Sequence, residues 1–204
     1  ILEESPDKQK TIDPFNKEEM RAILNELDGQ QKNLIQFSFW TGLRPSEVVS
    51  VKWNDIDWEK RKLFIKRAKT QKATAPETPK TKSGIRRLDL QVPAFEAIEK
   101  QKKYTFSQSE FIFHDPDTDK AWTGHQPIRR KVWIPALKKA NVRYRRPYQT
   151  RHTFASMMIT AEENLSWISK QIGHSNISTT MQFYADYIDD SLPDAGKKAV
   201  KMFF

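Results

Sequence analysis

The two ends of the chain carry apolar residues at helical spacing. Apolar positions between Met20 and Leu27 recur every three or four residues, which predicts an amphipathic helix. Asn16 and Glu19 form a capping-box pattern at its start, and Gly29 should stop it. The same criteria predict further helices over residues 32–40, 45–51, 93–104, 127–140, 150–162, 165–171 and 178–184, and a tail helix from residue 194.

The middle of the chain alternates apolar and polar residues over short runs, as strands do. Such runs, rich in β-branched and aromatic residues, cover 53–58, 63–68 and 85–90, and 111–113 is predicted as a short buried strand. The Lys-, Thr- and Pro-rich stretch 69–84 is predicted as an exposed, mobile loop between two strands of one sheet. Because strands and helices do not alternate, the predicted fold class is mainly α with a small antiparallel β-sheet (α+β).

The composition restricts the cellular setting. The 204 residues suffice for one domain with a core of its own. The chain has no cysteine, which excludes disulfides and thiolate metal sites. No apolar run approaches the roughly 20 residues of a membrane span, and the polar first ten residues do not resemble a signal peptide. We therefore expect a protein of the reducing cytoplasm that does not associate with a membrane.

The chain is strongly basic. The 35 basic residues exceed the 26 acidic ones by 9, and the sequence pI is about 9.6. The excess is concentrated in two blocks, since residues 60–87 hold one acid, Glu77, and residues 120–151 hold none. A solvated helix face normally mixes both signs, so these blocks predict a polyanionic partner, with nucleic acid ahead of an anionic membrane surface. The residues predicted to contact DNA are Lys69, Lys72, Lys82, Arg86, Arg129, Arg130, Arg145 and Arg146.

The last third of the chain carries an arginine, a histidine and a tyrosine at intervals suited to holding one phosphate between neighbouring helices. Arg151 lies at a predicted helix N-terminus, where a cation opposes the helix dipole, so an anion should lie nearby. His174 follows a glycine in a break between helices, and Tyr184 comes ten residues later. A guanidinium binds phosphate bidentately, an imidazole can donate to it, and a phenol can attack it.

Each candidate residue also has a purely structural explanation. Arg44 could offset the dipole at the end of a helix. His174 could be an ordinary turn residue, and Tyr184 a half-buried aromatic side chain of an amphipathic helix. The ordered set of these residues, rather than any single one, favours a catalytic role.

That set resembles the catalytic domain of the tyrosine recombinases, the phage-integrase family. The resemblance runs from about Ile12 to Tyr187, nearly the whole chain. The matching motifs are Thr-Gly-Leu-Arg-Pro-Ser-Glu at 41–47, Arg-His-Thr-Phe-Ala-Ser at 151–156, Gln-Ile-Gly-His-Ser at 171–175 and the tyrosine at 184. The implied activity is that of a phage or integrative-element integrase, which cleaves and rejoins double-stranded DNA at specific sites.

The resemblance implies a role for each matched position. Arg44 and Arg151 would clamp the scissile phosphate, and His174 would donate to it. Tyr184 would attack the phosphorus and form a 3′-phosphotyrosyl bond, while Glu47 would support the site without reacting. No metal, ATP or other cofactor is implied, because two guanidiniums can stabilise the charge of a pentavalent phosphate.

Two positions depart from the family pattern or leave it open. The family commonly has histidine three residues before the second arginine, and Tyr148 stands there instead. A phenol can donate to phosphate but, with a pKa near ~10, is a poor base at neutral pH, and the adjacent His152 is not geometrically equivalent. The lysine that would protonate the leaving oxygen is Lys80 or Lys82. The Lys-Thr pair favours Lys80, our preferred assignment, whereas the spacing to Arg86 favours Lys82.

The resemblance also predicts how the protein is organised. Residues 1–14 would link the catalytic domain, 15–187, to preceding DNA-binding domains that this sequence does not contain. The abrupt start without methionine suggests an excised fragment, which we expect to be a monomer alone and part of a tetramer on DNA. The tail, 188–204, would dock on a neighbouring protomer or pack on its own domain.

Two other functions fit parts of the same pattern. A type IB topoisomerase shares the chemistry, but the Gly-His-Ser turn before Tyr184 weighs against it. A DNA-binding module that has lost catalysis is the second alternative, to which Tyr148 lends slight support.

Overall fold

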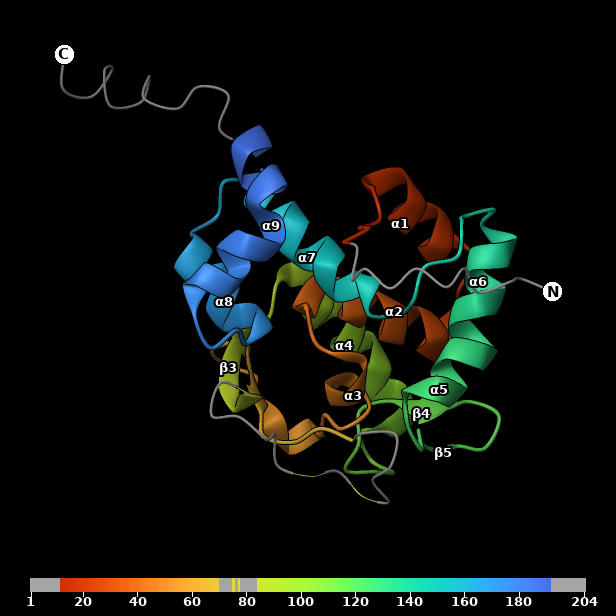
Figure 1. Cartoon of the computed structure of the whole chain (residues 1–204). Helices are drawn as coiled ribbons and strands as arrows, with labels where there is room; N and C mark the ends of the chain where they lie inside the picture. Colours follow the sequence, from red (N-terminus) through yellow and green to blue (C-terminus); the bar gives the residue numbers. More distant parts are fainter. Residues whose placement is uncertain (1–11, 70–74, 76, 78–83, 192–204) are drawn as a thin grey trace, which may run out of the picture.

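The computed structural model describes residues 12–69, 75, 77 and 84–191, which fold into a mainly helical domain with a small antiparallel sheet (Figure 1). The predicted fold class is therefore confirmed. No helix among these residues is both long and apolar enough to cross a membrane. The helices are α1 (Lys17–Asn25), α2 (Gly29–Thr41), α3 (Pro45–Val48), α4 (Val92–Thr105), α5 (His125–Ile128), α6 (Ile134–Lys139), α7 (Gln149–Thr160), α8 (Leu165–Ile172) and α9 (Ile177–Ser191).

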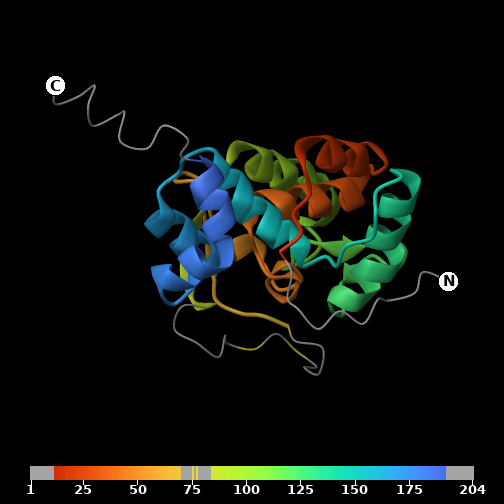
Figure 2. The ribbon, with the colours of Figure 1, turned by 45° about the horizontal axis from the view of Figure 1, so that its top comes forward.

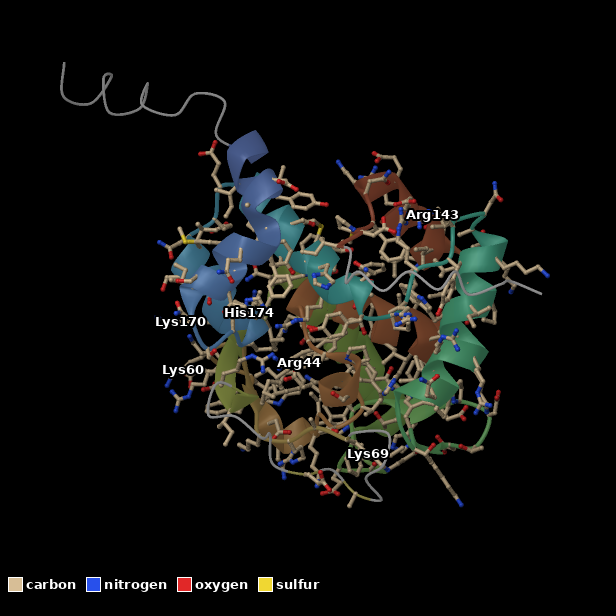
Figure 3. The ribbon with its side chains drawn as sticks, in the orientation of Figure 1. Arg44, Lys60, Lys69, Arg143, Lys170 and His174 are labelled. Carbon is tan, nitrogen blue, oxygen red and sulfur yellow. The ribbon has the colours of Figure 1, made fainter. Side chains whose placement is uncertain are left out.

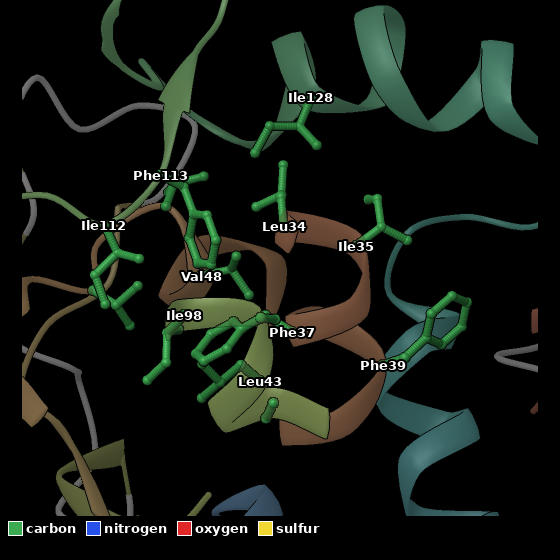
Figure 4. Packing of buried hydrophobic residues seen from close by; sticks show 14 of the residues in the cluster. Leu34, Ile35, Phe37, Phe39, Leu43, Val48, Ile98, Ile112, Phe113 and Ile128 are labelled. Atoms are coloured by element: carbon green, nitrogen blue, oxygen red, sulfur yellow. The ribbon is translucent and has the colours of Figure 1, made fainter. Parts of the chain in front are cut away.

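The larger hydrophobic core forms around α2, which contacts α1, α4 and α7. Leu34, Phe37 and Phe39 of this helix are fully buried. Phe15, just before α1, packs edge-on against Phe39 and Trp133, with ring centroids 5.7 and 5.5 Å away. Figure 4 shows part of the cluster, in which Ile35, Leu43, Val48, Ile98, Ile112, Phe113 and Ile128 are also labelled. Because α2 is covered on several sides, the loop that follows it starts from a rigid support.

A three-stranded antiparallel sheet lies beside these helices in the order β1-β2-β3. The strands are β1 (Ile56–Asp57), β2 (Lys62–Ile65) and β3 (Arg86–Asp89). Leu63 is paired with Leu88 and both are buried, whereas the neighbouring Lys62 and Asp89 form a partly exposed ion pair of 2.8 Å. This alternation confirms the period-two pattern of the sequence, although residues 53–55 form a 3₁₀ turn instead of the start of a strand.

A smaller second core joins the three C-terminal helices, α7, α8 and α9. Figure 2 shows α8 and α9 on the side of the molecule opposite α5 and α6. Its buried members are Phe154, Ala155, Met158, Ile159, Ile168, Ile172 and Tyr184. Helix α9 runs past its predicted end at Tyr184, but the backbone of that residue leaves helical geometry, with φ −124° and ψ 23°. The predicted tail helix from residue 194 lies outside the described residues.

Two predicted helix boundaries are wrong. Gly29 opens α2 instead of closing α1, and its φ of 46° is one that glycine tolerates. The helix expected over residues 127–140 is interrupted by a π-helical turn at Arg129–Trp133, between α5 and α6. Neither feature has a signature in hydrophobic spacing, which reports only a 3.6-residue period.

The strand expected at residues 111–113 is also wrong. Phe111 makes an isolated bridge with Lys52 instead. A two-stranded hairpin follows, formed by β4 (His114–Asp115) and β5 (Lys120–Ala121). Two-residue strands are too short to show alternation, so the sequence pattern could not indicate them.

Gly42 connects the two cores. It ends α2 in the left-handed conformation, with φ 64°, which favours glycine. A Cβ at this position would lie 2.6 Å from Cδ1 of Phe154 and 3.0 Å from Cγ2 of Ile172. The chain can therefore pass this close to α7 and α8 only because residue 42 has no side chain.

We expect Gly42→Ala to lower the free energy of unfolding by about 1–3 kcal/mol, because it adds both backbone strain and a clash. Urea denaturation measures the change. Gly124→Ala is the matched control, since Gly124 has an extended φ of 166° and no atom within 4 Å of an added Cβ. Equal stability of the two variants would contradict the prediction.

Candidate active site

A buried carboxylate, Glu47, holds two arginines from different segments. It is the third residue of α3, and Arg44 is the residue that precedes this helix. Oε1 of Glu47 accepts from Nη1 of Arg44 at 2.8 Å, and Oε2 accepts from the Arg44 backbone N–H at 2.9 Å. Nη1 and Nη2 of Arg86 donate to the same two oxygens at 2.9 and 3.0 Å. Burial alone would raise the pKa of Glu47, but Arg86 and then Arg44 outweigh it and lower that pKa, so the carboxylate is ionised.

Arg86 is not the surface cation that the sequence predicted. Its side chain is 7% exposed, and Nε donates to the carbonyl of Gln171 at 2.9 Å. A Cβ on Gly173 would lie 2.8 Å from its Cζ, so the turn after α8 rests directly on the guanidinium. Arg86 therefore connects β3 and α3 to that turn, and its donors are directed at protein groups rather than at DNA.

Arg151, in the first turn of α7, is buried with one unused donor. The residue is 1% exposed. Its Nη1 donates to the carbonyl of Gly42 at 2.9 Å, whereas the buried Nη2 has no hydrogen-bond partner. Burial lowers the pKa of the guanidinium to about 10, so the group remains charged at neutral pH. An unsatisfied buried donor on a cation is costly, and an anion beside Arg151 would relieve that cost.

His174 lies in the turn between α8 and α9, close to Arg44, and Figure 3 shows both near the middle of one view of the molecule. Nη2 of Arg44 reaches the carbonyl of Gly173, the preceding residue, at 3.5 Å. Nδ1 of His174 is 2.9 Å from the hydroxyl of Thr180. Burial and the charge of Arg151 lower the pKa of His174 to about 4, so its imidazole is uncharged at neutral pH. When Thr180 donates to Nδ1, Nε2 carries the ring proton and can donate to an anion.

The hydroxyl of Tyr184 contacts a histidine that the sequence did not single out as a site residue. It lies 2.7 Å from Nδ1 of His152, the residue after Arg151. Tyr184 is 1% exposed, and burial raises the pKa of its phenol even though the charge of Arg151 acts in the opposite direction. The phenol is therefore protonated in the free protein. The sequence feature that could have indicated His152 as a site residue is its position beside Arg151, one helical turn after Tyr148.

Tyr148 stands beside this pair and lines an open basic cleft. Its side chain is 40% exposed, and its ring centroid is 5.2 Å from that of His152. The cleft has a volume of about 370 Å³ and is lined by Arg44, Pro45, Ser46, His125, Gln126, Arg129, Tyr144, Arg146, Pro147 and Tyr148. Arg44 thus presents its partly exposed side to a cleft that carries further cations.

Arg145, a predicted DNA contact, is held by carboxylates instead. Its side chain is 10% exposed and pairs with Asp13 at 2.9 Å and Glu19 at 2.8 Å. The guanidinium also lies over the ring of Phe15, 4.5 Å from its centroid. These contacts hold residues 13–19 against the segment before α7. Arg145 therefore stabilises the fold, and its guanidinium is paired with carboxylates.

The other predicted DNA contacts are distributed unevenly. Arg130 and Arg146 are exposed, and Arg146 lines the cleft. Arg129 also lines it and donates to the Tyr144 hydroxyl at 2.7 Å. Figure 3 shows Lys69 toward the edge of the view, away from Arg44 and His174. Lys72, Lys80 and Lys82 lie outside the described residues.

The structure therefore places Arg44, Arg151, His174 and Tyr184 close enough for their charges to interact. The charges of Arg44 and Arg151 both act on His174, and that of Arg151 also acts on Tyr184. No group of three metal-ligating side chains occurs in the part of the chain that the structure describes. The available chemistry is an anion site with fixed donors and a phenol close to it.

Comparison with known sequences identifies the family of the chain. The profile of the phage integrase family matches residues 12–189. The chain is 34% identical over 200 residues to the prophage integrase IntR of Escherichia coli K12, a match that covers 87% of this chain and 48% of that protein. It is 30% identical over 199 residues to a tyrosine recombinase XerC-like protein of Caldanaerobacter subterraneus, covering 87% of this chain and 51% of the other. The chain thus spans about half the length of these relatives.

Solved structures share the fold. The Tn1549 transposon integrase, in complex with transposon right end DNA, superposes with a TM-score of 0.76 at 22% identity over 96% of this chain and 68% of that one. The catalytic domain of bacteriophage HP1 integrase gives a TM-score of 0.63 at 18% identity, over 94% of this chain and 95% of the other. Because the family profile also matches most of the sequence, the chain belongs to the phage integrase family.

Proposed function

We propose that this domain cleaves and rejoins DNA as the catalytic part of a site-specific recombinase, through a 3′-phosphotyrosyl intermediate. The observation that carries the proposal is the buried guanidinium of Arg151, whose Nη2 has no partner and whose charge acts on the phenol of Tyr184. A phosphodiester would supply the missing acceptor and, at the same time, an electrophile for the tyrosine. Family membership supports the same conclusion, and the related Tn1549 integrase was solved on DNA.

Three donors would bind the scissile phosphate. Arg44 and Arg151 neutralise its charge, and His174 donates from Nε2. Neighbouring groups already hold each donor in the free protein, namely the Glu47 carboxylate, the Gly42 carbonyl and the Thr180 hydroxyl. Donors fixed in advance stabilise the pentavalent transition state without having to reorganise.

Tyr184 would supply the nucleophile. Its oxygen forms a bond to phosphorus while the bond to the 5′ oxygen breaks, so one phosphodiester is exchanged for another. The 5′ hydroxyl of the same or another strand can then attack the phosphotyrosine and release the enzyme. Because bond energy is conserved in the covalent intermediate, neither ATP nor a metal is required. We propose Lys80 as the acid that protonates the leaving 5′ oxygen, with Lys82 as the alternative.

The basic cleft beside Arg44 would receive the DNA backbone next to the scissile phosphate, with Arg146 and Tyr148 among its lining residues. Three points of organisation stay predictions. They are a tetramer on two duplexes, preceding DNA-binding domains joined through residues 1–14, and docking of residues 188–204 on a neighbouring protomer.

We expect Tyr184→Phe to abolish covalent attachment to a nicked suicide duplex while DNA binding changes little, because only the nucleophilic oxygen is lost. Denaturing electrophoresis of the protein–DNA adduct measures attachment. Tyr187→Phe, three residues further along α9, is the matched control and should still attach. Attachment by Tyr184→Phe that disappears in Tyr187→Phe would show that the nucleophile is misassigned.

DNA binding should weaken steeply with salt, since most contacts are expected to be with phosphates. We expect Arg146→Gln to reduce the slope of log affinity against log salt by roughly 0.9, the value for one lost phosphate contact. Fluorescence anisotropy with a labelled duplex at several salt concentrations measures this slope. Lys103→Gln, an exposed charge on α4 that does not line the cleft, is the control. An unchanged slope in Arg146→Gln would contradict a role for this cleft in binding.

Lys80→Ala should cleave ordinary DNA poorly but recover on a substrate with sulfur in place of the 5′ bridging oxygen. A thiolate leaves without protonation because its pKa is roughly 8.5. Arg151→Ala should not recover, since its role is to stabilise phosphate charge. Recovery by Lys82→Ala but not Lys80→Ala would move the acid two residues along, and recovery by neither would require another donor.

A further inference from the structure

The contact between His152 and Tyr184 joins two helices at the reactive atom of the proposed nucleophile. His152 is on α7, Tyr184 is on α9, and the Tyr184 hydroxyl lies 2.7 Å from Nδ1. The two ring centroids are 5.8 Å apart, which places the imidazole against the phenol as well as against its oxygen. The backbone of α9 departs from helical geometry at Tyr184 itself. The two side chains therefore meet where the phenolic proton must be lost.

The protonation states of the pair define the direction of the hydrogen bond. Burial and the adjacent Arg151 lower the pKa of His152 to about 4, so its ring is uncharged at neutral pH. Burial raises the pKa of Tyr184, so the phenol keeps its proton. The phenol must then donate to Nδ1, and the ring proton of His152 resides on Nε2. An uncharged nitrogen with a free lone pair already faces the proton that has to leave.

The other candidate proton acceptors in the neighbourhood are less suitable. Tyr148 occupies the position of the family's usual histidine, but it is a phenol and its side chain is 40% exposed. Nδ1 of His174 is engaged with the hydroxyl of Thr180. His152, by contrast, already forms a hydrogen bond with the Tyr184 oxygen.

We propose that His152 is a catalytic residue of the proposed reaction and accepts the proton of the Tyr184 hydroxyl as that oxygen attacks phosphorus. The Tyr184 oxygen–phosphorus bond forms, the bond from phosphorus to the 5′ oxygen breaks, and the phenolic proton moves to Nδ1. The 5′ oxygen leaves with the bonding electron pair and takes a proton from the general acid. In the rejoining step His152 returns its proton to the tyrosyl oxygen, so the cycle balances.

A weakly basic histidine can perform this transfer because both acidities change during attack. The phenolic proton becomes strongly acidic as its oxygen bonds to phosphorus, so the transfer needs no free phenolate. In the free protein, burial and the charge of Arg151 lower the pKa of His152. A bound phosphate offsets the charge of Arg151 and so raises that pKa again. The other titratable groups that face the pair are Tyr148 immediately before α7, Tyr187 on α9 and His174 in the turn before α9.

His152→Asn separates proton transfer from hydrogen bonding. The asparagine amide oxygen can accept a hydrogen bond near the position of Nδ1 but cannot accept a proton at neutral pH. We expect single-turnover attachment to a suicide duplex to fall by about 10²-fold or more, the usual effect of losing a general base, while DNA affinity is unchanged. Wild-type attachment should be nearly independent of pH above neutrality, whereas that of His152→Asn should rise about tenfold per pH unit because hydroxide becomes the base.

A more acidic nucleophile provides a second readout that a purely structural role of His152 would not change. A fluorinated tyrosine incorporated at position 184 needs less help to lose its proton, so it should restore much of the attachment lost in His152→Asn. His114→Asn is the matched control, since His114 is a buried histidine whose Nδ1 also makes a hydrogen bond, to the Asp119 carbonyl at 3.0 Å, in the β4–β5 hairpin. Thermal melting of both variants checks that the fold is retained.

The outcomes distinguish this proposal from the function on which it rests. Attachment by His152→Asn at the wild-type rate and with the wild-type pH profile would overturn the role of His152 alone. A loss of attachment that the fluorinated tyrosine does not restore would also overturn it, and would leave His152 as a structural residue. Absence of attachment by the wild-type protein would contradict the proposed function and, with it, this role.

Discussion

The geometry of the site depends on one buried carboxylate, that of Glu47. Two guanidiniums that would otherwise repel each other converge on it, that of Arg44 just before α3 and that of Arg86 on β3. They donate three hydrogen bonds of 2.8–3.0 Å to its oxygens, and the Arg44 backbone N–H donates a fourth of 2.9 Å. Removing one partner of such a buried pair typically costs about 3–5 kcal/mol, because it leaves an uncompensated charge. Arg86 then supports the turn that carries Gly173 and His174. One carboxylate thereby positions Arg44, strand β3 and the turn that carries His174 relative to one another.

Arg151 is stabilised in a different way. It contacts the carbonyl of Gly42, and none of the described carboxylates forms an ion pair with it. This contact exists only because Gly42 lets the chain pass directly against α7 and α8. The free protein therefore keeps a buried cation with one unpaired donor, an arrangement that is unfavourable until an anion arrives. In the proposed function, the free energy that phosphate binding recovers would help to hold the DNA in the reactive position.

Burial and the charge of Arg151 determine the protonation state of two histidines. Burial, together with the charge of Arg151, lowers the pKa values of His152 and His174 to about 4, so both rings are uncharged at neutral pH. The positive charge of the site consequently resides on groups that do not exchange protons. The imidazoles of His152 and His174 and the phenol of Tyr184 are the groups that can donate or accept protons. In the proposed reaction this division would allow proton transfer without changing the charge of the arginines that bind the phosphate.

Much of the fold and of the candidate site could be predicted from the sequence, because the signals are local. Capping at Asn16, the apolar spacing of the helices and the alternation around Leu63 each involve a few neighbouring residues. Arg44, Glu47, Arg151, His174 and Tyr184 were found as an ordered set of motifs, for the same reason.

Only the tertiary structure decided which arginines are paired with carboxylates and what surrounds the proposed nucleophile, Tyr184. Arg86 and Arg145 look like surface cations in the sequence, but their carboxylate partners lie 39 and 132 positions away along the chain. The contact between His152 and Tyr184 spans 32 residues and depends on how α7 packs against α9. Hydrophobic spacing fixes which face of each helix is buried, but not which residues of two helices meet. The contacts between helices follow from the packing of the whole core around α2 and Gly42, and no local sequence pattern encodes that packing.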